Sequence, residues 1–112
     1  MQNGFHLLLL DDNPDDRLLI WRQLRNLFQD LHVTEVTHDK HFDQVLQQSH
    51  FDLVITDYQL RWTDGLSVLR RIKERWADCP TVMFTGTGSE EVAVEAMKLG
   101  LDDYVLKSPK HY

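Results

Sequence analysis

The stretch LLLLDDNPDD, residues 7–16, joins a run of four leucines to two adjacent aspartates. A short continuous apolar run is typical of a strand that is buried on both faces of a sheet. After it, Asn13 can cap a helix whose first residue is Pro14. Asp15 and Asp16 then fall in the first turn, where acids favour the positive end of the helix dipole. The stretch therefore predicts a buried strand that ends in acidic side chains and leads directly into a helix.

Five segments in all predict strands. Four are short apolar runs, rich in β-branched or aromatic residues or in leucine, which suits strands buried on both faces of a sheet. The fifth alternates between polar and apolar residues, as a more exposed edge strand would. The buried strands are predicted at residues 5–10, 52–57, 81–84 and 104–106, and the edge strand at 32–38.

Helical patterns lie between these strands. The first helix is expected to bury Ile20, Leu24, Leu27 and Phe28; the second spans 39–49 from an Asp39 cap; the third spans 64–76 and buries Leu66, Leu69 and Ile72; the fourth runs from Ser89 to Gly100. Strict alternation of strand and helix means a parallel sheet with right-handed crossovers and helices on both faces. The chain is therefore predicted to be an α/β protein with a doubly wound, five-stranded parallel sheet.

Polar residues lie at the end of each predicted buried strand. Asp11 and Asp12 follow the first, Asp57 ends the second, Thr85 follows the third and Lys107 follows the fourth. Because the strands of an open parallel sheet point the same way, these residues meet at the edge where such folds bind their ligands. We therefore expect three carboxylates, a hydroxyl group and an ammonium group in one crevice.

This combination of groups favours phosphoryl chemistry. Three nearby carboxylates repel one another and raise one another's pKa unless a cation compensates. Oxygen ligands without a soft donor favour a hard divalent ion, and Mg²⁺ fits best because it takes one or two carboxylates and bridges to a phosphate. The Asp57 carboxylate can attack phosphorus to form an acyl phosphate, while Lys107 and Thr85 can contact phosphoryl oxygens.

The composition argues against several other classes of function. The 112 residues suffice for one domain, and a net charge of −6 argues against a surface that binds nucleic acid. Cys79 is the only cysteine, and no apolar run approaches the roughly 20 residues of a membrane span. The six histidines are scattered, without the paired spacing of a metal-binding helix. We expect a cytoplasmic protein that binds neither nucleic acid nor a membrane directly.

Four segments resemble the receiver domain of two-component response regulators, the CheY-like family. They are LLLLDDNPDD (7–16), LVITDYQL (53–60), VMFTGTGS (82–89) and DDYVLKSP (102–109), and they occur in order and at the right spacing along the whole chain. The resemblance implies a flavodoxin-like sheet with strand order 2-1-3-4-5. It also implies a signalling domain that is no enzyme toward external substrates and that receives a phosphoryl group from a histidine kinase or a histidine phosphotransfer protein.

The resemblance implies the acceptor and the metal ligands. Asp57 matches the phosphoacceptor, and it ligates Mg²⁺ directly together with Asp12 and the backbone carbonyl of Gln59. Asp11 acts mainly through a metal-bound water. These four residues form the expected metal site.

A second group of residues matches the phosphoryl-binding and switch positions of the family. Lys107 pairs with the phosphoryl group, and Thr85, which precedes Gly86, moves to hydrogen-bond it. Tyr104 matches the switch aromatic, which turns into the space that Thr85 leaves. The chain departs from the family where Ser108 separates the lysine from proline, so the usual Lys-Pro turn is in doubt.

Two alternative functions remain open. One is a phosphatase that uses an aspartyl-phosphate intermediate. Phosphatases of the haloacid dehalogenase type carry an acid two residues after the nucleophile, where this chain has Gln59, which cannot act as an acid at neutral pH. The other is an interaction module of receiver fold that no longer uses phosphate. Such modules usually lose the lysine or an acid, and this chain retains both.

Two further expectations concern surfaces. Leu18 lies about 160° from the apolar face of the first helix, at roughly 100° per residue. With Trp21 at its flank, it is expected to dock a histidine-bearing helix, as this helix does in similar receivers.

The family also has a fifth helix beside the first, for which the five residues after Lys107 are too few. Residues 1–112 are therefore expected to be a fragment of a longer chain, or else a homodimer that covers the apolar face.

Overall fold

The computed structural model describes residues 4–107, and it shows a five-stranded, wholly parallel sheet. The strands are β1 (Phe5–Leu10), β2 (Leu31–Glu35), β3 (Leu53–Thr56), β4 (Thr81–Thr85) and β5 (Asp103–Leu106). They lie side by side in the order β2-β1-β3-β4-β5. The predicted strand number, direction and order are confirmed.

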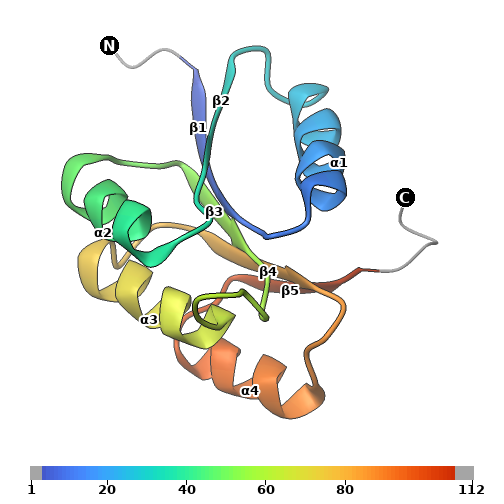
Figure 1. Ribbon diagram of the computed structural model, residues 1–112, viewed down its shortest axis with the longest axis vertical. Helices are drawn as coiled ribbons and strands as arrows, with labels where there is room; N and C mark the ends of the chain where they lie inside the picture. The colour runs from blue at the N-terminus through green and yellow to red at the C-terminus, as the bar shows by residue number, and fades with distance from the viewer. Residues whose placement is uncertain (1–3, 108–112) are drawn as a thin grey trace.

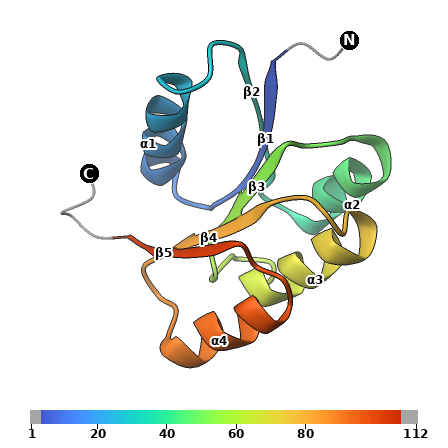
Figure 2. The same cartoon turned by 180° about the vertical axis from the view of Figure 1, so that it is seen from behind.

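Four helices lie in the described part of the chain. They are α1 (Pro14–Arg25), α2 (Asp39–Gln48), α3 (Gly65–Arg75) and α4 (Glu90–Lys98). Helix α1 covers one face of the sheet, and α2, α3 and α4 cover the other (Figures 1 and 2). The sheet is therefore doubly wound, as predicted. None of the helices in residues 4–107 is long and apolar enough to cross a membrane.

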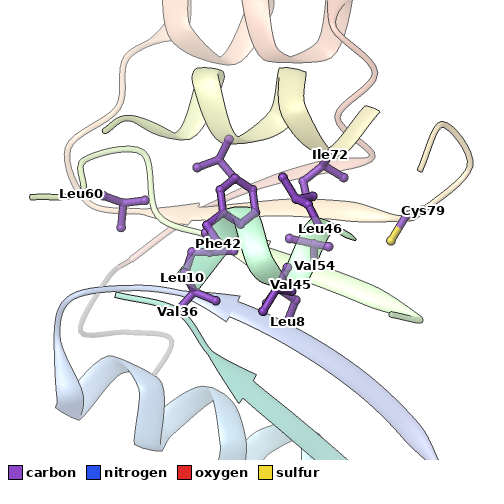
Figure 3. Close-up of a cluster of buried hydrophobic side chains, with 11 residues drawn as sticks. Leu8, Leu10, Val36, Phe42, Val45, Leu46, Val54, Leu60, Ile72 and Cys79 are labelled. Carbon is purple, nitrogen blue, oxygen red and sulfur yellow. The ribbon is translucent and has the colours of Figure 1, made fainter. Parts of the chain in front are cut away.

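The leucine run of β1 forms the centre of both cores. Leu7 and Leu9 pack on the α1 side with Ile20, while Leu8 and Leu10 belong to the opposite cluster. That cluster is built around the ring of Phe42 from α2 (Figure 3). All four leucines are fully buried. Successive strand residues point to opposite faces, so a continuous apolar run is what a strand covered on both sides requires.

Local capping explains where the helices begin and end. The Asn13 side chain accepts the backbone N–H groups of Asp15 and Asp16, and Ser89 caps α4 in the same way. Gly100 follows α4 with a φ of +101°, the left-handed conformation that glycine adopts most readily. These starts and stops agree with the predictions.

Several predicted boundaries were wrong. The cap of α2 is His38, whose Nδ1 accepts the His41 backbone N–H at 3.2 Å, and Asp39 is instead the first helical residue. Because residues 36–38 turn into this cap, β2 ends at Glu35 rather than at residue 38. Helix α3 is one residue shorter at each end than predicted, with Asp64 as its cap.

Two predicted burials were also wrong. Leu27 is 73% exposed because α1 ends at Arg25 and the helical periodicity stops before it. Strand β5 is only half-buried, with Leu106 exposed, because it is the last strand of the sheet and is paired on one side only. Phe28, in contrast, is partly buried and stacks on Phe5 with ring centroids 3.9 Å apart.

An open apolar groove lies on the α1 side of the sheet. It has a volume of about 330 Å³ and runs between α1 and the strands β3, β4 and β5. Its lining residues are Leu19, Ile20, Gln23, Leu24, Ile55, Val82, Phe84 and Val105. The groove lies beside α1, on the apolar face that the sequence analysis expects to be exposed without a fifth helix.

Candidate functional site

The carboxyl ends of the strands meet around the side chain of Lys107. Its Nζ lies 2.8 Å from Oδ2 of Asp11, which follows β1, and 2.8 Å from Oδ2 of Asp57, which follows β3. A third carboxylate, Oδ2 of Asp16 in the first turn of α1, is also 2.8 Å away. The predicted convergence of acids and lysine is therefore present for Asp11, Asp57 and Lys107.

Asp11 is the most deeply buried acid of this site, with 2% of its surface exposed. Burial raises the pKa of its carboxyl group, and the hydrogen bonds from Lys107 and from the Asn13 backbone N–H oppose that shift. Arg17 adds support from α1, because its Nη1 donates to the Asp11 carbonyl oxygen at 2.6 Å. The position of Asp11 is thus fixed from several sides.

The charge of Lys107 is held by its carboxylate partners. Burial alone would lower the pKa of this ammonium group, but its hydrogen bonds to Asp11, Asp16 and Asp57 raise the pKa above the usual 10.5. The Nζ atom also lies 5.5 Å from the ring centroid of Phe84. Lys107 is therefore a fixed cation at neutral pH.

Asp57 has both of its carboxylate oxygens engaged. Oδ1 accepts the Tyr58 backbone N–H at 2.7 Å, and Oδ2 accepts from Lys107. The side chain is 14% exposed, so one side remains open to solvent. Asp57 is thus oriented and still reachable from outside.

The other two predicted metal ligands, Asp12 and Gln59, contact the loop after β3. Asp12 Oδ2 accepts the Arg61 backbone N–H at 2.6 Å, which joins the loop after β1 to the loop after β3. Gln59 is exposed and pairs with Asp64 in an isolated antiparallel bridge. Within residues 4–107, no three histidine, cysteine or acidic side chains are arranged to hold a metal ion. The metal site therefore stays a prediction, although its carboxylate and carbonyl donors suit Mg²⁺.

Thr85 lies at the same edge but faces its own loop. It is fully buried at the end of β4, and its carbonyl oxygen accepts the Lys107 backbone N–H at 2.9 Å. Its hydroxyl oxygen accepts the Thr87 backbone N–H at 3.2 Å and lies 3.3 Å from the Thr87 hydroxyl. The next residue, Gly86, is exposed. Thr85 is thus near the lysine, with its hydroxyl group turned to Thr87.

The predicted switch residue Tyr104 is partly buried and packs against a core cluster on the α3 and α4 side of the sheet. That cluster consists of Leu66, Leu69, Met83, Ala96 and Leu101. The hydroxyl oxygen of Tyr104 is buried and has no hydrogen-bond partner in the described part of the chain. This oxygen lies against Gly88, where a methyl group added to the glycine would overlap it. Burial, and secondarily the charge of Asp57, raises the pKa of the phenol above its usual 10.0.

The predicted docking residues are exposed on α1. Leu18 is 44% and Trp21 37% exposed, and the Arg25 guanidinium lies 4.7 Å from the Trp21 ring centroid. Both residues line a shallow groove of about 520 Å³ between α1 and β2, which also includes Val33 and Glu35.

Sequence reasoning missed Asp16 and Arg17 as parts of this site. The sequence indicates Asp16 only as an acid of the first helical turn, where acids are common for capping reasons alone, and it indicates no role for Arg17. No local spacing indicates the contact between Asp16 and Lys107, because the two residues are far apart in the sequence.

The fold and this edge together define a doubly wound α/β domain with a charged site at the carboxyl ends of its strands. Residues 7–111 match the response regulator receiver domain, and the chain belongs to this family of two-component signalling domains. The family that the sequence motifs predicted is therefore confirmed.

Curated relatives are similar over most of the chain. It is 32% identical over 101 residues to the C4-dicarboxylate transport transcriptional regulatory protein DctD of Pseudomonas aeruginosa, which is 90% of this chain and 21% of that protein. It is 30% identical over 105 residues to the transcriptional regulatory protein ResD of Bacillus subtilis, which is 94% of this chain and 42% of that protein. The chain thus spans less than half the length of either relative.

Solved structures share the fold. The phosphorylated cyanobacterial phytochrome response regulator RcpA superposes with a TM-score of 0.83 at 25% identity, covering 96% of this chain and 83% of that one. A response regulator from Burkholderia pseudomallei, solved with a phosphorylated aspartic acid, a calcium ion and citrate, gives a TM-score of 0.80 at 24% identity. That match covers 92% of this chain and 59% of the other.

Proposed function

We propose that Asp57 accepts a phosphoryl group from a phosphohistidine of a histidine kinase or histidine phosphotransfer protein. The observation that carries this proposal is the Lys107 ammonium group, which donates to the carboxylates of Asp57 and Asp11 at 2.8 Å each. A fixed cation beside a carboxylate stabilises the negative charge of a phosphoryl group that arrives on that carboxylate. In this proposal the domain turns over no external substrate.

The transfer is a displacement at phosphorus. An oxygen of Asp57 forms the new P–O bond while the P–N bond to the donor imidazole breaks. The electron pair of that bond stays on the imidazole nitrogen, and the product is an acyl phosphate. The Tyr58 N–H group and Lys107 hold one carboxylate oxygen each, which orients Asp57 before the donor arrives.

The acidic residues supply the donors for a divalent cation. Asp11, Asp12, Asp57 and the backbone carbonyl of Gln59 would hold Mg²⁺, whose charge offsets that of the carboxylates and of the phosphoryl oxygens. The calcium ion in the Burkholderia response regulator supports a divalent cation in this fold. Chelation of Mg²⁺ should accordingly prevent phosphorylation.

Phosphorylation would change the surface near β4 and β5. The Thr85 hydroxyl group would leave Thr87 and donate to the phosphoryl group. Gly86 offers room beside it, because a methyl group added there would come no closer than 3.7 Å to Cβ of Lys107. Gly88 lies next to both Tyr104 and Thr85, and Tyr104 would turn into the space that Thr85 leaves. The altered surface would then be read by a partner or by another part of the protein.

The experiment combines a phosphoryl donor with purified protein. Acetyl phosphate, or a phosphorylated histidine phosphotransfer protein, should label the wild type in the presence of Mg²⁺ and not after chelation. The Asp57→Asn variant, nearly identical in shape, should remain unlabelled in a phosphate-affinity gel. Equal labelling of this variant would contradict the proposal. Steady release of phosphate from small phosphate esters would instead support the phosphatase alternative, and an unlabelled wild type the interaction module.

A further inference from the structure

Asp16 is a carboxylate of the site that comes from a helix rather than from a strand end. Its Oδ2 lies 2.8 Å from Nζ of Lys107, the same distance as the Asp11 and Asp57 oxygens. An ammonium group has three N–H donors, so these three carboxylates can each accept one of them. The Asp16 side chain is 13% and that of Lys107 12% exposed, so the pair is largely shielded from solvent.

The neighbouring acid separates this contact from ordinary helix capping. Asp15 also lies in the first turn of α1, but it is exposed, whereas the Asp16 side chain is largely buried. Both acids favour the positive end of the helix dipole by their position. Asp16 is in addition directed at Lys107, which points to a role beyond capping.

The number of carboxylates matters when Asp57 changes. Formation of the acyl phosphate removes the negative charge from the Asp57 carboxylate. The Lys107 N–H group that donates to Asp57 then becomes available to the phosphoryl oxygens. Asp11 and Asp16 then remain as the two carboxylates that hold the ammonium group in place beside the phosphoryl oxygens. Without Asp16, Asp11 would be the only carboxylate left to position it, and Lys107 is a flexible side chain on four methylene groups.

We propose that Asp16 is a positioning residue for phosphoryl transfer, which holds the Lys107 ammonium group beside Asp57 through their ion pair. This inference rests on the proposed function of Asp57 as phosphoacceptor. It also connects α1, the helix that carries the exposed Leu18 and Trp21, directly to the site.

The test compares Asp16→Asn with Asp15→Asn, because both remove one negative charge from the same turn. Labelling by acetyl phosphate at saturating Mg²⁺ should be about three- to tenfold slower in Asp16→Asn than in the wild type, since about 1.4 kcal/mol corresponds to a factor of ten. Asp15→Asn should label at the wild-type rate, and Asp16→Glu should recover part of it. Thermal unfolding checks that all variants are folded.

A second readout reports on Lys107 without phosphoryl transfer. Reductive dimethylation followed by peptide mass spectrometry measures how well each lysine is protected, with Lys40 and Lys98 as internal references. Lys107 should become more reactive in Asp16→Asn and stay protected in Asp15→Asn. If Asp16→Asn matches Asp15→Asn in labelling rate and in Lys107 protection, or labels faster than the wild type, the inference is wrong. A wild type that acetyl phosphate does not label would overturn the proposed function, and this inference with it.

Discussion

At the scale of single residues, Gly88 determines where the hydroxyl group of Tyr104 can lie. The hydroxyl oxygen occupies space that a side chain at position 88 would fill, and it is buried without a partner among residues 4–107. A buried, unpaired hydroxyl group costs about 1–3 kcal/mol, which is offset here by packing of Tyr104 against the core cluster that contains Met83 and Ala96. Tyr104 is thus held inward by packing alone, and a small change beside it should move it.

We predict that Gly88→Ala drives the Tyr104 hydroxyl group into solvent and lowers the pKa of the phenol toward its usual value. The cost should be about 1 kcal/mol, at the low end for overpacking, because the released hydroxyl group regains water. Ultraviolet titration against Tyr104→Phe measures this pKa. Gly86→Ala is the matched control, since a methyl group there meets only ordinary contact with Lys107. An unchanged Tyr104 pKa in Gly88→Ala would contradict the prediction.

The pH dependence of stability gives the same prediction a second form. The pKa of Tyr104 is raised in the folded state, so its neutral phenol contributes to the free energy of unfolding. This contribution is fully present below about pH 10, the usual pKa of tyrosine, and is lost as the pH rises through the pKa of the folded state. Denaturant unfolding measured across this range should show a smaller loss for Gly88→Ala than for the wild type. An equal loss would mean that Tyr104 stays buried.

At the scale of elements, α1 presents two different sides. Ile20 and Leu24 face the sheet, while Leu18 and Trp21 are exposed beside basic residues of the same helix. A single exposed leucine is common on protein surfaces, but a neighbouring exposed tryptophan and a shallow groove at the α1–β2 junction make this surface suitable for an amphipathic helix.

We predict that Leu18→Glu slows transfer from a phosphorylated histidine phosphotransfer protein about tenfold while labelling by acetyl phosphate is unchanged. The loss follows from placing a charge against the apolar face of the docked helix. Val94→Glu is the matched control, because Val94 is similarly exposed, at 55%, but lies on α4. If both donors are affected, the variant is misfolded; if both variants slow the transfer equally, α1 is not the docking helix.

The strands were predictable from sequence because four of them are short apolar runs between clear helix signals, and the fifth, β2, alternates between polar and apolar residues. The four leucines of β1 and the residues after β1, β3 and β5 placed Asp11, Asp57 and Lys107 at one edge without any structural information. The end of α1 was not predictable from apolar spacing. Leu27 continues the helical pattern in sequence but lies beyond the last helical residue, so its exposure depends on where the helix stops.

Contacts between segments that are far apart in the sequence were also beyond sequence reasoning. The Asp16–Lys107 pair depends on the angle at which α1 leaves the sheet, and the bond from the Arg61 N–H to Asp12 depends on the path of a loop. No local pattern encodes either geometry. Likewise, residue type favours Asp39 over His38 as a helix cap, and only the structure shows that the His38 side chain accepts the His41 backbone N–H.

At the scale of the whole molecule, an open groove on the α1 side leaves part of the sheet uncovered among residues 4–107. Its lining is almost wholly apolar, and burial of such surface contributes about 25 cal/mol per Å². The relatives that this chain matches are longer than the matched region. We propose that a further helix of a longer polypeptide covers this groove, so that residues 1–112 are part of a larger protein.

We predict that a polypeptide extended by about 15 residues of its natural continuation, enough for a helix of average length, unfolds at higher denaturant concentration than residues 1–112. An extension of equal length made of glycine and serine is the control and should add no stability. Sedimentation tests whether a second copy of the chain covers the groove instead. A concentration-dependent dimer of residues 1–112 would show that a second copy covers it, and a stable monomer that gains nothing from the natural extension would contradict the proposal.

The central claim is that Asp57 becomes an acyl phosphate, and chemical mapping of the modified residue tests it most directly. The protein is incubated with acetyl phosphate and Mg²⁺, reduced with borohydride, which converts an aspartyl phosphate to homoserine, and analysed by peptide mass spectrometry. The account predicts homoserine at position 57 in the wild type, none after chelation of Mg²⁺ and none in Asp57→Asn. Homoserine at Asp11, Asp12 or Asp16 with an unmodified Asp57 would contradict it.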